Sequence, residues 1–244
     1  MIELFLRDDD VDSEKESLHR LIGVALKWHV PISFGVIPAS LTKEARHLLN
    51  SVKSSHPDLI ELHQHGWKHA NHEGATGKGE FGPKRSYDQQ LDDLRRGRDT
   101  LEQAFGGNFF PAFSPPWNIY TVDTTRAMRE LGFSVLSAGV PYVVPCGHNI
   151  QNYPVMLDIL NWCYPTTLEY SRAIFLYMFA KLGNLPRPVG LLLHHMEMTA
   201  ETFELLETQL ERLWETEQVV FHTFETLEGK RIRSEEAEKH PNKT

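Results

Sequence analysis

The chain has 244 residues, of which 41% are hydrophobic, and it carries a formal net charge of −8. A chain of this length suits one domain of barrel size, and its apolar content is ample for a large core. The negative charge and the lack of a basic stripe argue against nucleic acid as a partner.

Targeting and cysteine signals are sparse. Cys146 and Cys163 are the only cysteines and form no Cys-x-x-Cys motif, so we expect two free thiols in a reducing compartment. The first ten residues lack the basic start and apolar run of a signal peptide. The longest apolar run, Ala173–Ala180, is too short to cross a membrane. We therefore expect a cytoplasmic protein without a membrane span, and nothing in the sequence indicates an oligomeric state.

Short apolar runs alternate with amphipathic stretches in the first half of the chain. The apolar runs predict strands at Ile2–Leu6, Pro31–Ile37, Leu59–Leu62 and Phe109–Phe113. Helices are predicted after a Ser13-x-x-Glu16 capping box, over Lys43–Val52, and from a Ser86-x-x-Gln89 capping box to about Phe105. Residues 73–85 hold four glycines and a proline and are predicted to form a loop.

The second half continues this alternation with one irregular interruption. Helices are predicted at Thr121–Leu131, Leu168–Leu182 and Ala200–Glu215, and strands at Phe133–Leu136, Val189–Leu193 and Val219–Phe224. The proline-rich stretch 139–165 is irregular, with short strands expected at Tyr142–Val144 and Val155–Leu157.

The order of these elements predicts an α/β fold with a parallel sheet. About seven strand–helix units favour a closed or nearly closed (β/α) barrel over an open sheet. We expect residues 1–228 to form a single domain and residues 229–244 to form a charged, flexible tail.

Three adjacent carboxylates, Asp8, Asp9 and Asp10, directly follow the first predicted strand. A run of this kind is most often a solvated turn or the charged start of a helix, because adjacent carboxylates repel one another. Here Arg7 stands beside the run as a counter-charge, and the strand ends of a βα-repeat fold converge on one face. Two neighbouring carboxylates there can divide the work, one binding a metal and the other taking a proton from the metal's water.

Four histidines, His63, His65, His69 and His72, lie within ten residues after the third predicted strand. His65 and His69 are four residues apart, the spacing that places two imidazoles on one face of a helical turn in other zinc sites. His63 and His65 would share a face if the strand continued. Solvent-exposed or core histidines would explain this clustering less well, so we favour metal binding.

Taken in order, these segments resemble the polysaccharide deacetylase family, the NodB-type carbohydrate esterases of family four. Five stretches carry the resemblance: Arg7–Val11, His65–His69, Phe113–Asn118, Asp158–Trp162 and Leu192–His195. They are similar, in that order, to the family's strand ending in Asp-Asp, its His-Ser/Thr-x-x-His motif, its proline-rich strand end, its Asp–Trp pair and its Leu-x-His. The resemblance covers residues 2–195 and implies a distorted seven-stranded NodB-like barrel and a metal-dependent deacetylase.

The resemblance implies a metal site and a general base. Asp10, His65 and His69 would hold one divalent metal, with zinc the first choice and cobalt, nickel or iron as alternatives. Asp9 would be the base that activates water. An alignment shifted by one residue would instead make Asp8 the base and Asp9 the ligand.

The resemblance also implies a general acid and a place for the developing charge. His194 would protonate the leaving amine, with Asp158 as its supporting carboxylate, and His195 stays open as the alternative acid. A backbone N–H near Pro116 and Trp117 would help to hold the charge that develops on the acyl oxygen.

Trp162 and Leu192 also match the family, whereas Ser114 and Gly66 depart from it. Trp162 and Leu192 would wall a pocket for the acetyl methyl, although core packing explains Trp162 equally well. Ser114 stands where the family usually has an arginine that holds the base, so either Arg7 takes that role or the base is held less well. Gly66 replaces the Ser/Thr that often steadies the second motif.

The implied substrate is an acetylated carbohydrate, such as a small acylated amino sugar or a nucleotide- or lipid-linked sugar. The loop at residues 73–85 would either shape substrate choice or be a mobile surface loop. Two other functions stay open. The His63-x-His65 pattern also occurs in amidohydrolase-like and phosphoesterase-like barrels, which often hold two metals. The missing arginine would also fit a non-catalytic barrel that binds a glycan.

Overall fold

The structure is a computed structural model that describes residues 1–140, 149–160, 173, 176–177, 179–215 and 218–239. Its strands are β1 (Ile2–Val11), β2 (Ile32–Val36), β3 (Ile60–His65), β4 (Phe109–Ser114), β5 (Val135–Leu136), β6 (Gln151–Asn152), β7 (Val155–Asp158), β8 (Val189–Leu193) and β9 (Val219–His222). Its helices are α1 (Glu16–Trp28), α2 (Lys43–Ser55), α3 (Tyr87–Phe105), α4 (Val122–Glu130), α6 (Ala200–Glu215) and α7 (Phe224–Lys239). Five single-turn 3₁₀ helices join them: η1 (Pro38–Ser40), η2 (Gly74–Thr76), η3 (Gly106–Asn108), η4 (Pro116–Asn118) and η5 (Leu182–Asn184).

The strands form one parallel sheet in the order β6-β5-β4-β3-β2-β1-β8-β7, and β9 pairs with β1. The two ends of this order, β6 and β7, are consecutive in the chain, and an isolated parallel bridge joins Gly139 to Val155 in β7. The sheet therefore curls until its two edges approach each other, which confirms the expected α/β barrel. The described strands number nine rather than about seven, since β5 and β6 are only two residues each and β9 is added beside β1.

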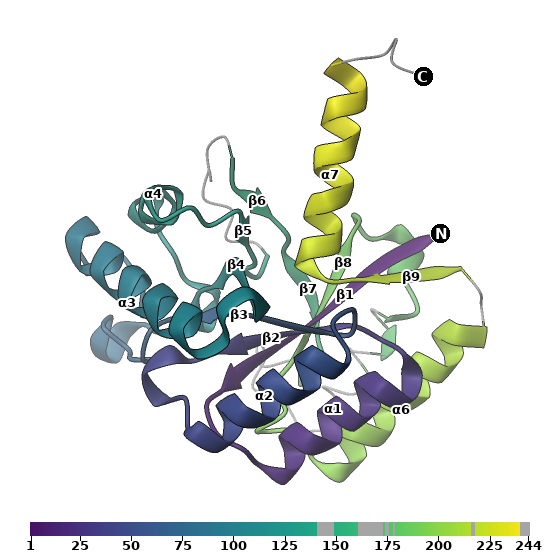
Figure 1. The fold of residues 1–244 in the computed structure, drawn as a ribbon. Helices are drawn as coiled ribbons and strands as arrows, with labels where there is room; N and C mark the ends of the chain where they lie inside the picture. Colours follow the sequence, from purple (N-terminus) through teal and green to yellow (C-terminus); the bar gives the residue numbers. More distant parts are fainter. Residues whose placement is uncertain (141–148, 161–172, 174–175, 178, 216–217, 240–244) are drawn as a thin grey trace.

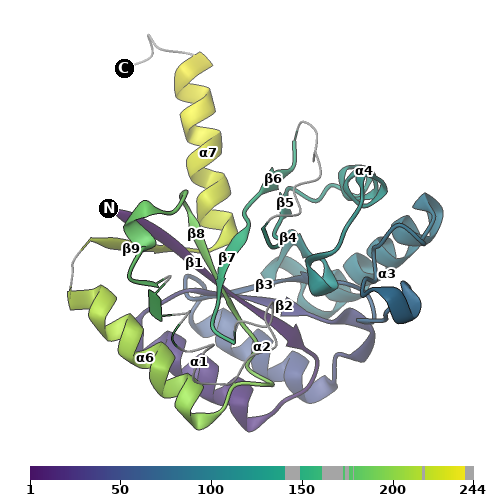
Figure 2. The ribbon, with the colours of Figure 1, turned by 180° about the vertical axis from the view of Figure 1, so that it is seen from behind.

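Helices cover the sheet on its outside. Figures 1 and 2 show α1, α2 and α6 along one side of the strands and α3 and α4 along another. The largest apolar cluster lies between the sheet and the first group, and a second cluster joins α3 and α4 to β4 and β5. A third cluster includes Phe5, Tyr153, Val155 and Phe224 and contains side chains from β1, β7 and the start of α7.

α7 begins against the sheet and then extends away from it (Figure 1). Glu61 of β3 accepts hydrogen bonds from the backbone N–H groups of Phe224 and Glu225, at 3.0 and 2.8 Å, so a buried carboxylate caps the start of the helix. α7 includes residues 229–239, which we expected to belong to a tail.

Other sequence predictions differ from the structure at element ends. The first helix has Lys15 at its N-cap and no side-chain cap, so the predicted capping box at Ser13 is wrong, whereas the box at Ser86 is confirmed. β1 continues through all three aspartates, and β3 continues to His65. The predicted strand at residues 142–144 and most of the predicted helix at 168–182 lie outside the described residues.

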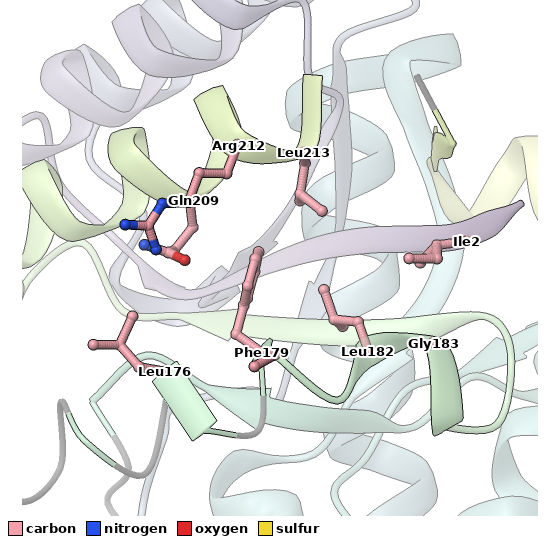
Figure 3. Close-up of a pocket in the computed structure, with 9 residues that line it drawn as sticks. Ile2, Leu176, Phe179, Leu182, Gly183, Gln209, Arg212 and Leu213 are labelled. Atoms are coloured by element: carbon pink, nitrogen blue, oxygen red, sulfur yellow. The ribbon is translucent and has the colours of Figure 1, made fainter. Parts of the chain in front are cut away.

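A hollow of about 410 Å³ lies between the start of β1 and α6 (Figure 3). It is mainly apolar, lined by Ile2, Leu176, Phe179, Leu182 and Leu213 among others. Ile2 and the three aspartates lie at opposite ends of β1, so this hollow is separate from the polar residues described next. In the described part of the chain, no helix is both long and apolar enough to cross a membrane.

Candidate active site

A pocket of about 170 Å³, lined by several ionisable side chains, opens at the carboxyl ends of the strands. Its walls come from β1, β3, β7 and β8 and from the turns that follow β3, β4 and β8. The lining residues are Asp9, Asp10, His65, His69, Trp117, Asn118, Asp158, Leu192 and His194. The sequence prediction that distant strand ends converge on one site is therefore reproduced in the described chain.

Asp10, His65 and His69 form the tightest cluster in this pocket. Nε2 of each histidine lies 3.2 Å from Oδ1 of Asp10. Two ligands of a tetrahedral zinc ion at about 2.0–2.2 Å from the metal are separated by a similar distance. Oδ1 of Asp10 is buried and has no hydrogen-bond partner among the described residues, so a cation between the three atoms would satisfy it. The residues therefore fit a divalent metal.

Backbone geometry brings both Asp9 and Asp10 to the pocket. Alternation along a strand would put Asp9 on one face and Asp8 with Asp10 on the other. The chain departs from this pattern at Asp10, whose φ is 67°, and the pairing of β1 with β2 shifts register between Asp8 and Val11. As a result Asp9 and Asp10 both line the pocket, and Asp8 does not.

His65 and His69 are not on a helical turn, and that part of the prediction is wrong. His65 is the last residue of β3, and the chain then reverses through Gly66, with φ of 60°, and His69, with φ of 56°. A Cβ atom at residue 66 would lie 2.1 Å from Oε2 of Glu80 and 2.5 Å from Cγ of Pro116. This close approach explains why glycine stands at residue 66.

Ser114 connects three polar side chains below the pocket. Its hydroxyl lies 2.9 Å from Nδ1 of His65, 3.0 Å from Nε2 of His63 and 3.4 Å from Oδ1 of Asp9. A hydroxyl has one proton to donate, and the carboxylate can only accept it, so both rings donate to Ser114. His65 then carries its proton on Nδ1 and presents the lone pair of Nε2 to the metal position.

His63 and His65 share one face of β3, as expected, but His63 does not line the pocket. Burial lowers the pKa of His63 to about 3, and its ring packs edge-on against Phe224. His63 is therefore a neutral hydrogen-bond donor inside the barrel. His72 is exposed and also lies outside the pocket lining.

Arg7 is fully buried and holds Asp9. Its Nη2 donates to Oδ2 of Asp9 at 2.8 Å and to Oδ1 of Asn118 at 2.9 Å, while Nη1 donates to the carbonyl and hydroxyl of Ser137 at 2.6 and 3.0 Å. Burial alone would raise the pKa of Asp9, but the charges of Arg7 and His65 outweigh it, and the pKa is lowered. Asp9 is therefore ionised, with Oδ1 free of the guanidinium.

Neighbouring charges also shift the pKa values of Asp10, His65 and His69. Burial opposes ionisation of Asp10, yet the neighbouring imidazoles His65 and His69 bring its pKa well below the usual range. Burial also opposes the charged form of His65, but Asp9 and Asp10 raise its pKa. Burial and the nearby His65 lower the pKa of His69. Two ionised carboxylates facing two imidazoles favour a cation at this point.

The two adjacent histidines after β8 have different surroundings. His194 lines the pocket together with Asp158 and Leu192. His195 is fully buried away from it: its Nδ1 lies 2.7 Å from Oδ2 of Asp8, and its backbone N–H donates to Oδ1 of Asp8 at 2.8 Å. Burial lowers the pKa of His195, but the Asp8 carboxylate outweighs this and raises it. The geometry thus favours His194 over His195 as the residue that meets a substrate.

Trp117 forms one wall of the pocket from η4, directly after β4. Its backbone is left-handed, with φ of 56°, and the indole packs on His69 with ring centres 4.3 Å apart. Pro116 is buried beside Gly66. Trp162, which we expected to wall the pocket, lies outside the described residues.

Several contacts that hold the residues of the pocket were not predicted from the sequence. Ser137 and Asn118 hold Arg7, and Asp8 holds His195, although none of these partnerships follows from a motif. Glu80 accepts three backbone N–H groups from the turn that carries His69. Its only signal in the sequence is its place in the glycine-rich loop that follows the histidines.

Known proteins resemble this chain in sequence and in fold. The family model described as polysaccharide deacetylase matches residues 8–136, more than half of the chain. No curated protein matches the sequence. Similar folds include a polysaccharide deacetylase structure from Mycobacterium smegmatis, at 16% identity and a TM-score of 0.71, with 96% of this chain and 91% of that chain covered.

Two other solved structures are similar in fold. An acetyl xylan esterase of family 4 from Clostridium thermocellum, solved with a cobalt ion, has 16% identity and a TM-score of 0.60, with 92% of this chain and 89% of that chain covered. A family 4 pseudoenzyme from Bacillus anthracis has 16% identity and a TM-score of 0.61, with 91% and 64% covered. At such identities the likeness concerns the fold.

Proposed function

Because the chain belongs to the polysaccharide deacetylase family, a family of hydrolases that act on acetyl amide or ester bonds, we propose that it removes an N-acetyl group from an amino sugar. The observation that carries the proposal is the convergence of a candidate metal-binding triad, a buried ionised carboxylate and a histidine around one pocket.

Asp10, His65 and His69 would hold one divalent metal, with zinc as the first choice and cobalt, nickel or iron as alternatives. Three protein ligands leave a coordination position open, as in catalytic rather than structural zinc sites. When bound, the metal would polarise the acyl carbonyl and lower the pKa of water. Ser114 supports this ligand set, because it fixes the His65 ring with Nε2 toward Asp10.

Asp9 is the proposed general base. Arg7 occupies Oδ2, while Oδ1 has the long 3.4 Å bond from Ser114 and Nδ1 of His65 at 3.7 Å, and it can take a proton from the attacking water. The lowered pKa keeps the carboxylate ionised. Arg7 thereby supplies, from β1, the positive charge that the family usually places at the position of Ser114.

His194 is the proposed acid, delivering a proton to the leaving nitrogen, and Asp158 lines the same pocket. Leu192 and Trp117 give the pocket apolar walls next to these polar groups, which suits a small acyl group. The backbone near Pro116 and Trp117 would orient the acyl oxygen. A role for Trp162 stays a prediction.

The test is acetate release from N-acetylated amino sugars, sugar nucleotides and short chitin oligomers. Protein loaded with zinc or cobalt would be compared with chelator-treated protein. We expect acetate only from the metal-loaded protein. No release from any substrate, with one metal bound per chain, would contradict deacetylation of these compounds and favour a non-catalytic relative such as the pseudoenzyme of similar fold.

The two-metal alternative has less support. It needs His63 at the pocket, but His63 donates to Ser114, packs against Phe224 and does not line the pocket. The non-catalytic alternative was based on the missing arginine, and Arg7 already occupies its place beside Asp9. Metal content distinguishes the first alternative, because a two-metal enzyme would bind two ions per chain.

A further inference from the structure

The turn that follows β3, residues 66–69, is built around one buried carboxylate, that of Glu80. Its Oε2 accepts the backbone N–H groups of Trp67 and His69 at 3.0 and 3.3 Å, and its Oε1 accepts that of Lys68 at 2.7 Å. The side chain is 1% exposed. Three consecutive N–H groups that converge on one carboxylate form a rigid, charge-assisted turn.

Besides Glu80, the side chain of Gln64 holds the start of this turn, because its Nε2 donates to the carbonyl of Gly66 at 2.9 Å. Gly66 stands where the resembling family has Ser or Thr, and Oε2 of Glu80 lies 2.1 Å from the position that a Cβ of residue 66 would take. Pro116 limits the same space from the other side, at 2.5 Å. Glu80 therefore occupies the space that a side chain at residue 66 would need, and it binds the backbone on both sides of Lys68.

Glu80 is itself fixed in place. The next residue, Phe81, is fully buried and packs edge-on against Phe113 of β4, with ring centres 5.0 Å apart. The preceding Gly79 donates its N–H to Asn71 and accepts from that of His72, at 3.1 and 2.9 Å. The loop is thus anchored on β4 at one side of Glu80 and closed on itself at the other.

We propose that Glu80 is a positioning residue that holds the turn of residues 66–69 so that His69 reaches the metal position beside Asp10, in place of the side chain that Gly66 lacks. The proposal rests on the proposed metal site, because it assigns the turn a purpose in ligand geometry. Partners of metal ligands of this kind typically contribute about 10- to 100-fold to metal affinity.

A second reading makes Glu80 a ligand of another metal, with His72 and Asp93, since these three groups lie near one another. The contacts oppose it. Both oxygens of Glu80 already accept backbone N–H groups, and Asp93 pairs with Arg85 at 2.7 Å.

The chain offers a matched control in the same loop. Glu73 is also a buried carboxylate, and its Oε1 accepts a backbone N–H, that of Lys84, at 3.2 Å. Among the described residues, the hydrogen bonds of Glu73 are with Asn71 and Lys84 and not with residues 66–69. Glu80→Gln and Glu73→Gln thus remove the same charge from the same loop and differ in which backbone they release.

Two measurements test the proposal. Hydrogen exchange on metal-free protein should show that Glu80→Gln loses protection at Trp67, Lys68 and His69, whereas Glu73→Gln loses it at Lys84. Competition with a chromophoric chelator should show zinc or cobalt bound about 10- to 100-fold more weakly by Glu80→Gln. For Glu73→Gln we expect an affinity like that of the wild type.

If Glu80→Gln does not fold, Glu80→Asp is the substitute variant. It keeps both acceptor oxygens, but its side chain is shorter and holds them farther from the turn. We expect its metal affinity to lie between those of wild type and Glu80→Gln. Equal metal affinity for wild type and the Glu80 variants, or equal weakening in Glu73→Gln, would overturn the proposal. If wild type binds no metal, the proposed function fails instead, and hydrogen exchange still decides whether Glu80 braces the turn.

Discussion

At the scale of single residues, Asp9 and Asp10 are neighbours with different tasks. Asp10 meets two imidazole nitrogens, whereas Asp9 meets Arg7 and Ser114. Asp9→Asn keeps the size of the side chain but removes the proton acceptor. We expect kcat to fall by about 10²- to 10⁴-fold while metal stoichiometry is unchanged. An Asp9→Asn protein that no longer binds metal would show that Asp9 is a ligand and that the base is elsewhere.

Arg7 also belongs to this scale, because its guanidinium is buried against a buried carboxylate. Arg7→Met would leave Asp9 without its counter-charge, and such losses cost about 3–5 kcal/mol. Arg96→Met is the control. Arg96 pairs with Asp92, the Arg96 side chain is more than half exposed and that of Asp92 is half exposed, so this pair contributes at most about 1 kcal/mol. Urea unfolding of metal-free protein measures both. Similar losses for the two variants would contradict a special role for the Arg7 pair.

Sequence analysis could identify residues whose chemistry is unusual at strand ends. Asp9, Asp10 and His65 are such residues, and the structure brings them to one pocket. The sequence alone could not identify Ser114 or Glu80 as groups that support the site. A serine or glutamate in a loop has many uses, and its partners depend on backbone turns that hydrophobic patterning does not determine.

At the scale of elements, β1 and the turn after β8 are joined by the buried pair of Asp8 and His195. Because Asp8 accepts both the backbone and the ring N–H of His195, it also fixes the backbone next to His194. Period-two alternation predicts that Asp8 and Asp9 face opposite sides, but it does not predict the partner of Asp8. It also fails at Asp10, where the left-handed backbone turns the side chain toward the pocket.

This pair makes stability depend on pH. The pKa of His195 is raised in the folded protein, since the carboxylate of Asp8, with smaller effects from Asp10 and Asp12, outweighs burial. The stabilisation is therefore complete below the unfolded pKa of about 6.5 and is lost as the pH rises through the folded pKa.

For metal-free protein, we expect the free energy of unfolding to fall more steeply with rising pH in wild type than in His195→Gln. Unfolding curves between about pH 6 and pH 9 give the two slopes. His195→Gln removes the titrating ring and retains an amide that can donate to Asp8. Parallel slopes would mean that the His195 pair is not the source of the dependence.

At the scale of the whole molecule, the α/β barrel could be predicted because apolar runs alternate with amphipathic stretches along the chain. The two-residue strand β6 and the helix over residues 229–239 could not be predicted, since two residues give no periodic pattern and residues 229–244 were expected to form a charged tail. Phe224, the first residue of α7, is fully buried. Its ring contacts Phe5 and His63, each with ring centres 5.3 Å apart, and stacks on Tyr153 at 6.4 Å.

Phe224 therefore links the start of α7 to the polar network beneath the site, because His63 donates to Ser114. Phe224→Ala would open a cavity among the rings, and we expect it to lower the free energy of unfolding by about 3–5 kcal/mol. Ile232→Ala, on the exposed part of the same helix, should change it by no more than about 0.5 kcal/mol. Denaturant unfolding of the two variants measures both free-energy changes. If Phe224→Ala unfolds like Ile232→Ala, the packing of Phe224 does not stabilise the barrel.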